Sequence, residues 1–295
     1  MIVDLVKTTT SDGVRLDGAL HLPPHGIDQI VGLDAVICLH GVSGNFYGST
    51  LFERIAPSFL DLGIAVLWGN TRGHDGFNTA ITTHQKRRQG AAYETVDECR
   101  LDIAAWSNFL IKLGYSRQAI CGHSLGAIKG IYNQAHKPID AVKLIVAASP
   151  PRLSYSAFNN AENSTEFFET TATANQYVKD GRPETLMDVK FPFPLLITAG
   201  GYLDKYGKQE RYNILRFADK VSCPVLFTYG QRELECSGIS FAGVPEALSQ
   251  LPGARESFKI VTIPDADHSY FGKYELLSKE IVNWLHERFA ADKGI

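Results

Sequence analysis

A serine between two glycines stands where a predicted buried strand turns into a helix. Residues 119–127 read Ala-Ile-Cys-Gly-His-Ser-Leu-Gly-Ala, so Gly122 and Gly126 flank Ser124 in a Gly-x-Ser-x-Gly pattern. Because glycine has no side chain, strand and helix can approach closely while Ser124 occupies a strained turn with its hydroxyl exposed. The pattern alone arises by chance in about one of ten chains of this length. Its meaning therefore depends on whether other segments supply a base, an acid and an anion site.

The base and the acid are predicted from strand ends later in the chain. His268 follows the last predicted strand, and functional groups gather at the carboxyl ends of strands in open parallel sheets. There it can take the proton of Ser124 and return it to a leaving group. Glu233 comes three residues after the glycine that ends the preceding strand, and it is the preferred acid to hold the imidazole in one tautomer. Glu235 is the alternative acid.

Two backbone amides are the expected donors to an oxyanion, because fixed N–H groups stabilise it better than mobile side chains. One is the amide of Leu125, at the positive end of the helix that follows the serine. The other comes from the turn His40-Gly41-Val42, where Val42 is preferred and Gly41 is the alternative. We expect His40 to shape this turn by hydrogen bonding.

The elements that must position these residues alternate along the chain. After a predicted hairpin at residues 2–10 and 14–22, strands and helices follow one another, and this rhythm predicts βαβ units and a parallel sheet. A polar stretch up to about residue 92 is expected to be loop. The predicted strands lie at 35–39, 64–68, 119–123, 142–148, 224–229 and 258–263, and the predicted helices at 49–62, 93–113, 124–136, 243–251 and 273–290.

The alternation fails between residues 151 and 220. This stretch is rich in polar residues, yet it also holds aromatic residues such as Tyr155, Phe158 and Phe167, which are too many for a solvated tether. We interpret it as a helical cap over the carboxyl edge of the sheet. The predicted organisation is thus a core domain of residues 1–150 and 221–295 with a cap insertion at 151–220.

The composition excludes several classes of function. With 295 residues, 44% hydrophobic and 21% charged, and a formal net charge of −3, the chain shows no electrostatic preference for nucleic acid or an anionic membrane. The one dense basic run, Lys86-Arg87-Arg88, is interpreted as a solvated loop or helix start. No secretion signal, membrane span or cysteine pair is recognisable, which predicts a cytoplasmic protein with reduced thiols. No metal-ligand spacing or phosphate loop is present, so neither metal nor cofactor is expected.

These features together resemble the α/β-hydrolase family. The resemblance lies in the order Ser, acid, His, in the strand that ends in His-Gly, in the Arg72-Gly73 turn and in the Gly-His-Ser-Leu-Gly motif. It implies an α/β fold with a mostly parallel sheet of about eight strands and a triad of Ser124, Glu233 and His268. Haloalkane dehalogenases and epoxide hydrolases of this fold carry aspartate as the nucleophile, so a serine argues against both. The chain departs from the family in using Glu as the acid and in placing Asn70 where Asp often precedes the Arg-Gly turn.

The expected function is a carboxylesterase-like serine hydrolase that cleaves a small-to-medium ester through an acyl-enzyme. Two alternatives stay open. One is a C–C bond hydrolase, acyltransferase or thioesterase with the same residues, which product analysis with a competing alcohol would separate from hydrolysis. The other is a non-catalytic ligand receptor, which tight binding without turnover would indicate. The expected partner is a small acyl substrate; the substrate itself and a homodimer are left open by the sequence.

Overall fold

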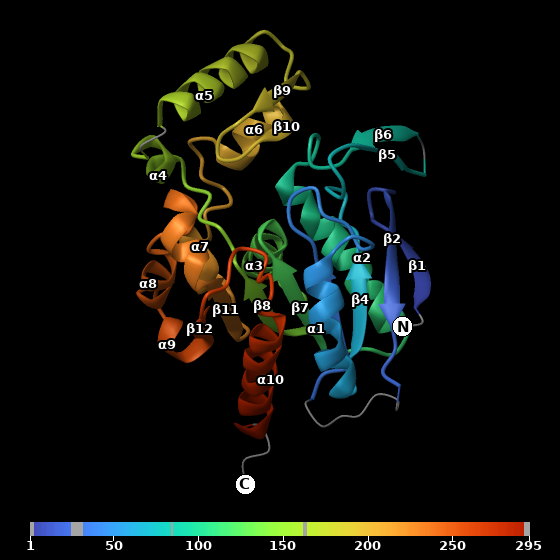
Figure 1. The fold of residues 1–295 in the computed structure, drawn as a ribbon. Helices are drawn as coiled ribbons and strands as arrows, with labels where there is room; N and C mark the ends of the chain where they lie inside the picture. The colour runs from blue at the N-terminus through green and yellow to red at the C-terminus, as the bar shows by residue number, and fades with distance from the viewer. Residues whose placement is uncertain (1–2, 25–31, 84, 162–163, 292–295) are drawn as a thin grey trace.

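An eight-stranded sheet forms the centre of the structure, a computed structural model that describes residues 3–24, 32–83, 85–161 and 164–291 (Figure 1). Six neighbouring strands of this sheet pair in parallel, whereas the two strands at one edge pair antiparallel. The mostly parallel eight-stranded sheet predicted from the sequence is therefore confirmed. The strand order is β1 (Asp4–Thr9), β2 (Arg15–His21), β4 (Ala65–Gly69), β3 (Ala35–Leu39), β7 (Gln118–His123), β8 (Val142–Ala148), β11 (Val225–Gly230) and β12 (Phe258–Ile263).

Helices cover both faces of this sheet, which explains why β3 and β4 are apolar along their whole length. The helices α1 (Thr50–Asp61) and α10 (Tyr274–Ala291) pack on one face, where Phe59 and Trp284 belong to one buried cluster. The helices α2 (Cys99–Lys112) and α3 (Leu125–His136) pack on the other face, where Trp106 and Ile128 belong to a second cluster (Figure 1). The sheet thus separates two hydrophobic cores.

The helix predicted at 93–113 begins later than expected. A 3-10 turn, η2 (Val96–Glu98), precedes α2, and residues 93–95 lie outside any helix. The Val96 amide donates to Asp204 Oδ2 at 3.3 Å, and the Asp97 amide donates to the Tyr212 hydroxyl at 2.9 Å. These two amides bind side chains of a distant segment, and the α-helix begins only at Cys99. Such long-range contacts leave no periodic signal in the sequence.

Residues 151–220 fold into α4 (Tyr155–Asn159), α5 (Ser164–Lys179), β9 (Leu186–Val189), β10 (Leu195–Thr198) and α6 (Ala199–Tyr206), followed by the 3-10 turns η3 (Ile214–Arg216) and η4 (Ala218–Lys220). The segment contains helices, as expected, and also a two-stranded antiparallel sheet of β9 and β10. Its aromatic residues form their own core: the rings of Phe158, Phe167 and Phe191 lie 5.2–5.5 Å apart. Figure 1 shows the segment beyond the carboxyl ends of the central strands. Its role as a cap and the domain boundaries remain predictions.

Three further segments differ from the expectations. The stretch before residue 92 contains a hairpin of β5 (Asn78–Ile81) and β6 (Lys86–Gln89) instead of loop, and Lys86, Arg87 and Arg88 are exposed on β6. The helix expected at 243–251 is α8 (Val244–Ser249), accompanied by the shorter α7 (Gln231–Cys236) and α9 (Ala254–Ser257) and by the 3-10 turn η5 (Gly238–Ser240). Ile2 of the first predicted strand and residues 25–26 after the hairpin lie outside the described residues. Among the helices within the described ranges, none combines the length and the apolar character that crossing a bilayer requires.

Candidate active site

The serine of the Gly-x-Ser-x-Gly motif occupies a sharp turn between β7 and α3. Ser124 has φ 55° and ψ −122°, a strained conformation for a residue with a side chain. A Cβ at Gly126 would overlap the carbonyl oxygen of Leu39, and a Cβ at Gly122 would overlap that of Gly126. The two glycines therefore allow backbone-to-backbone packing of strand and helix. The turn is fixed further because the Ser124 amide donates to the Ala148 carbonyl at 2.8 Å.

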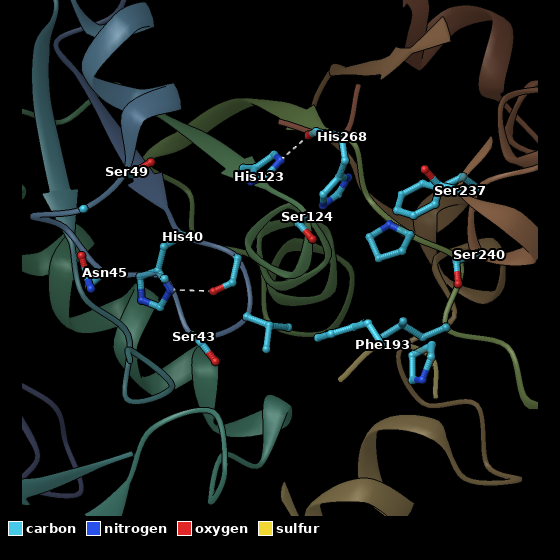
Figure 2. A pocket seen from close by; sticks show the side chains of 18 of the residues that line it. His40, Ser43, Asn45, Ser49, His123, Ser124, Phe193, Ser237, Ser240 and His268 are labelled. Carbon is cyan, nitrogen blue, oxygen red and sulfur yellow. Dashed lines mark hydrogen bonds between the residues drawn. The ribbon is translucent and has the colours of Figure 1, made fainter. Parts of the chain in front are cut away.

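His268 and Glu233 form a hydrogen-bonded pair at the carboxyl edge of the sheet. His268 lies in the loop after β12, and its Nδ1–H donates to Glu233 Oε1 at 2.5 Å. The Glu233 side chain is fully buried, whereas the imidazole is 35% exposed. Because Nδ1 carries the proton, Nε2 is free to accept one. Figure 2 shows the imidazole of His268 and the side chain of Ser124 at the same pocket.

The second oxygen of Glu233 is held by two donors. The Gly230 amide donates to Oε2 at 3.0 Å, which also caps the first turn of α7, and the Ser149 hydroxyl donates to the same oxygen at 2.7 Å. Tyr270 lies behind this contact, with its hydroxyl 2.8 Å from both Ser149 Oγ and Thr228 Oγ1. The carboxylate is thus surrounded by hydrogen-bond donors although it is buried, as an ionised buried group requires.

His123 fixes the main chain of His268. Its Nε2–H donates to the His268 carbonyl oxygen at 2.8 Å, and the two ring centroids are 4.8 Å apart. Burial, aided by the neighbouring His268, lowers the pKa of His123 to about 3, so the ring is neutral near pH 7. A neutral His123 places no charge beside the imidazole of His268.

Two unengaged amides lie near the serine. Among the hydrogen bonds of the described residues, none uses the N–H of Val42 or of Leu125 as donor. Gly41 passes close to the serine: a Cβ added to it would lie 3.2 Å from Ser124 Cβ and 3.7 Å from Ser124 Oγ. The absence of a side chain at Gly41 allows this approach. Amides free of internal partners beside a nucleophile can bind a developing oxyanion.

His40 supports the turn that carries Gly41 and Val42. Its Nδ1–H donates to the Gly41 carbonyl at 2.9 Å, and its Nε2 accepts the Thr71 amide at 3.0 Å. The side chain is buried, and burial together with the nearby Lys129 lowers the pKa of His40 to about 3. The imidazole is therefore neutral, with one nitrogen donating and the other accepting.

A pocket of about 600 Å³ connects these groups. Figure 2 shows Ser43, Asn45 and Ser49 on one side of Ser124 and Ser237, Ser240 and Phe193 on the other. None of the residues that line it is an acid, a lysine or an arginine. The lining residues are His40, Gly41, Val42, Ser43, Gly44, Asn45, Gly48, Ser49, Phe52, His123, Ser124, Pro151, Leu153, Pro192, Phe193, Ser237, Ser240, Phe241 and His268.

The structure brings most of the residues proposed from the sequence into one place. Ser124, His268, Val42 and Gly41 line the pocket, and Glu233 contacts His268 from beneath it. The alternative acid, Glu235, is exposed and instead accepts a hydrogen bond from Gln231 at 3.0 Å. In the described part of the chain, no group of three or more His, Cys, Asp or Glu side chains has the arrangement of a metal site.

Sequence reasoning missed the supporting contacts of Ser149, Tyr270 and His123. Ser149 has φ 50° in the structure, and its one signal in the sequence was its place directly after the apolar strand Val142–Ala148. Tyr270 comes two residues after His268, yet its contacts depend on β8 and β11. His123 lies next to Ser124 in the sequence and lines the pocket, but its hydrogen bond to the main chain of His268 joins two distant segments.

Comparison with known proteins gives structural matches only. No protein-family profile and no curated relative matches the sequence. The structure resembles Est1E from Butyrivibrio proteoclasticus, solved with ferulic acid bound (TM-score 0.66, 18% identity, 96% of this chain and 99% of that one). It also resembles the alpha/beta hydrolase GrgF from Penicillium sp. sh18, with a TM-score of 0.70 and 15% identity over 98% of this chain and 100% of that one. The Pyrococcus furiosus esterase Pf2001 is similar with a TM-score of 0.63 and 18% identity over 98% of this chain and 91% of that one. At such identities the likeness establishes the fold.

Proposed function

We propose that this chain, which has the α/β-hydrolase fold, is a serine hydrolase that cleaves a small-to-medium carboxylic ester through an acyl-enzyme. The observation that carries the proposal is the His268–Glu233 hydrogen bond at the pocket where Ser124 stands in its strained turn. One of the solved structures that it resembles, Pf2001 from Pyrococcus furiosus, is an esterase by description, which agrees with this activity. The uncharged pocket lining suits a neutral ester.

In the proposed reaction Ser124 Oγ attacks the carbonyl carbon of the ester, and its proton passes to His268 Nε2. Glu233 holds the protonated imidazole in place through Nδ1–H. The negative charge that develops on the carbonyl oxygen is stabilised by the Val42 and Leu125 amides. His268 then protonates the departing alcohol, and the acyl group remains on Ser124.

The second half repeats these roles with water. His268 removes a proton from a water molecule, whose oxygen attacks the acyl carbon. When the tetrahedral intermediate collapses, Ser124 leaves and recovers its proton from His268. The acid product then departs, and the enzyme returns to its starting state without any cofactor.

Labelling with a fluorophosphonate and mass spectrometry tests this proposal. The wild-type protein should carry the label on Ser124 and lose its activity on p-nitrophenyl acetate or butyrate in parallel. Ser124→Ala should be neither labelled nor active, whereas Ser249→Ala, on an exposed position of α8, should behave as the wild type. Full activity in Ser124→Ala, or a label on another residue, would contradict the proposal.

A further inference from the structure

Three charged side chains are buried together beside the pocket loop. Glu94, Lys129 and Lys205 are each at most 1% exposed. Lys129 Nζ is in direct contact with Glu94 Oε1, and Lys205 Nζ lies 3.7 Å from Glu94 Oε2. We call these three residues the buried ion cluster. It holds two ammonium groups for one carboxylate, so either lysine alone would suffice to balance Glu94.

The two lysines of the buried ion cluster differ in what else they touch. Lys129 lies on α3, and its Nζ also donates to Thr71 Oγ1 at 3.0 Å. Lys205 lies on α6, and its Nζ has no hydrogen-bond partner within the described residues. Burial lowers the pKa of Lys205, and Glu94 opposes this shift only in part. Only Lys129 therefore connects the cluster to other elements by a hydrogen bond.

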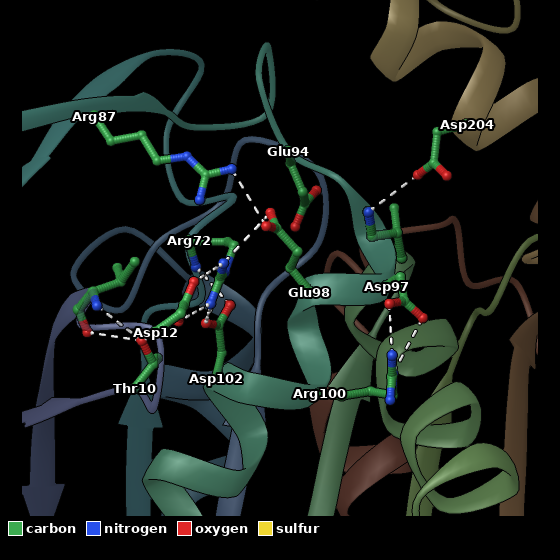
Figure 3. Close-up of polar contacts among 12 residues, drawn as sticks. Thr10, Asp12, Arg72, Arg87, Glu94, Asp97, Glu98, Arg100, Asp102 and Asp204 are labelled. Carbon is green, nitrogen blue, oxygen red and sulfur yellow. Dashed lines mark hydrogen bonds and ion pairs between the residues drawn. The ribbon is translucent and has the colours of Figure 1, made fainter. Parts of the chain in front are cut away.

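From Thr71 a continuous path leads to the turn beside Ser124. The Thr71 amide donates to His40 Nε2 at 3.0 Å, and His40 Nδ1–H donates to the Gly41 carbonyl at 2.9 Å. The neighbouring Arg72 anchors Thr71 from the other side: its amide donates to Asp102 Oδ2 at 2.9 Å, and its guanidinium pairs with acids around it (Figure 3). Thr71 is thus held between two charged groups of side chains.

The end of this path determines where the Val42 amide points. The Gly41 carbonyl and the Val42 N–H belong to one planar trans peptide unit, so they point in opposite directions. A hydrogen bond that holds the Gly41 carbonyl on His40 therefore also fixes the direction of the Val42 N–H. This hydrogen bond and the acceptance of the Thr71 amide at Nε2 together require a neutral His40 with its proton on Nδ1. Burial and the nearby Lys129 favour that state, because they lower the pKa of His40.

We propose that Lys129 is a positioning residue for the oxyanion site: by its hydrogen bond to Thr71 it holds His40, and through His40 the Gly41–Val42 peptide, in the orientation that stabilises the transition state. This inference rests on the proposed serine hydrolase function. It assigns Lys129 no contact with substrate. Its effect should appear on kcat, because the oxyanion forms only after the ester has bound.

Two matched substitutions separate this role from general support of the core. Lys129→Met and Lys205→Met each remove one ammonium group from the buried ion cluster, and each leaves Glu94 with one lysine. Only Lys129→Met loses the hydrogen bond to Thr71. Because loss of a whole oxyanion donor lowers kcat by about 10²–10³-fold, a misaligned donor should lower it by about 10–100-fold.

The experiment measures kcat and KM on a p-nitrophenyl ester that the wild type turns over, together with the rate of fluorophosphonate labelling of Ser124. We expect Lys129→Met to lower kcat about 10–100-fold with KM changed less than threefold and labelling slowed in parallel. Lys205→Met should stay within threefold of the wild type. Equal losses in both variants, or none in Lys129→Met, would overturn the inference. Failure of the wild type to be labelled at Ser124 would instead refute the proposed function.

Thr71→Val keeps the experiment decisive if Lys129→Met does not fold. This substitution removes Oγ1, which accepts from Lys129 and also lies 3.1 Å from His40 Nε2, so it interrupts the path between Lys129 and His40 at that atom. It keeps the backbone amide that donates to His40. It changes no buried charge. A loss of kcat of about tenfold or more at unchanged KM supports the inference, and a wild-type kcat refutes it.

Discussion

Replacing Glu233 with glutamine should abolish catalysis by reversing the tautomer of His268. In the structure Glu233 Oε2 accepts from two donors, the Gly230 amide and the Ser149 hydroxyl, while Oε1 accepts from His268 Nδ1–H. A glutamine has one acceptor oxygen, and two donors on one side outweigh one on the other. Its oxygen should therefore face Gly230 and Ser149, and its NH₂ group should face Nδ1.

An NH₂ group can face Nδ1 only if that nitrogen accepts, which moves the ring proton to Nε2. His268 then has no lone pair for the proton of Ser124. The equivalent change in other triads, with geometry preserved, lowers kcat by about 10⁴-fold, and we expect a similar loss here. Glu233→Gln removes a buried charge without changing shape, so the protein should still fold.

Steady-state kinetics on a p-nitrophenyl ester, with circular dichroism to verify folding, measures this effect. Glu235→Gln is the matched control, because Glu235 lies on the same helix but is exposed, and its carboxylate accepts a hydrogen bond from Gln231 instead of from His268. It should retain wild-type kcat. A folded Glu233→Gln variant with kcat within tenfold of the wild type would refute the tautomer reasoning.

Two predictions concern stability. Glu94→Gln leaves both lysines of the buried ion cluster without a countercharge, so the free energy of unfolding in urea should fall by about 3–5 kcal/mol. Glu184→Gln, at an exposed ion pair, is the control. A loss below about 1 kcal/mol in Glu94→Gln would contradict the electrostatic explanation. The folded pKa of His40, about 3, lies below its ordinary value of 6.5, so the unfolded chain binds more protons between these values and stability falls as pH decreases from about 6.5. The measurement compares the free energy of unfolding at pH 6 and pH 4 for the wild type and for His40→Asn. In the variant this free energy should fall less steeply with decreasing pH, by up to ~1.4 kcal/mol per pH unit. An unchanged slope would count against a neutral buried His40.

The sheet was predictable because its signals are local. The continuous apolar run at β3 and the Gly-x-Ser-x-Gly turn after β7 each reflect constraints that a few neighbouring residues satisfy. His268 and Glu233 were predictable for the same reason, because each follows a predicted strand and therefore lies at the carboxyl edge of the sheet. Their catalytic roles remain predictions, but the geometry that those roles require is present between them.

The buried ion cluster and the β5–β6 hairpin were not predictable in this way. Lys129 stands in an ordinary helical sequence, and its burial depends on Glu94 and Lys205, which come from other segments. The strands of the hairpin are four residues long and one of them is largely basic, so neither shows a periodic apolar pattern. Both features arise from pairing between distant residues, which one sequence does not encode locally.

The strand order of the sheet has a consequence for the synthesis of the protein and for its partial unfolding. Ser124 follows β7 in the middle of the sheet, whereas His268 follows β12, an edge strand that pairs only with β11. During synthesis Ser124 therefore emerges well before His268, and under the proposed function the nascent chain should be inactive until β12 has paired with β11. In the mature protein an edge strand detaches more readily than a central one. Under the proposed function, turnover therefore depends on the pairing of β12, and it should vanish in mild denaturant while the central strands are still folded.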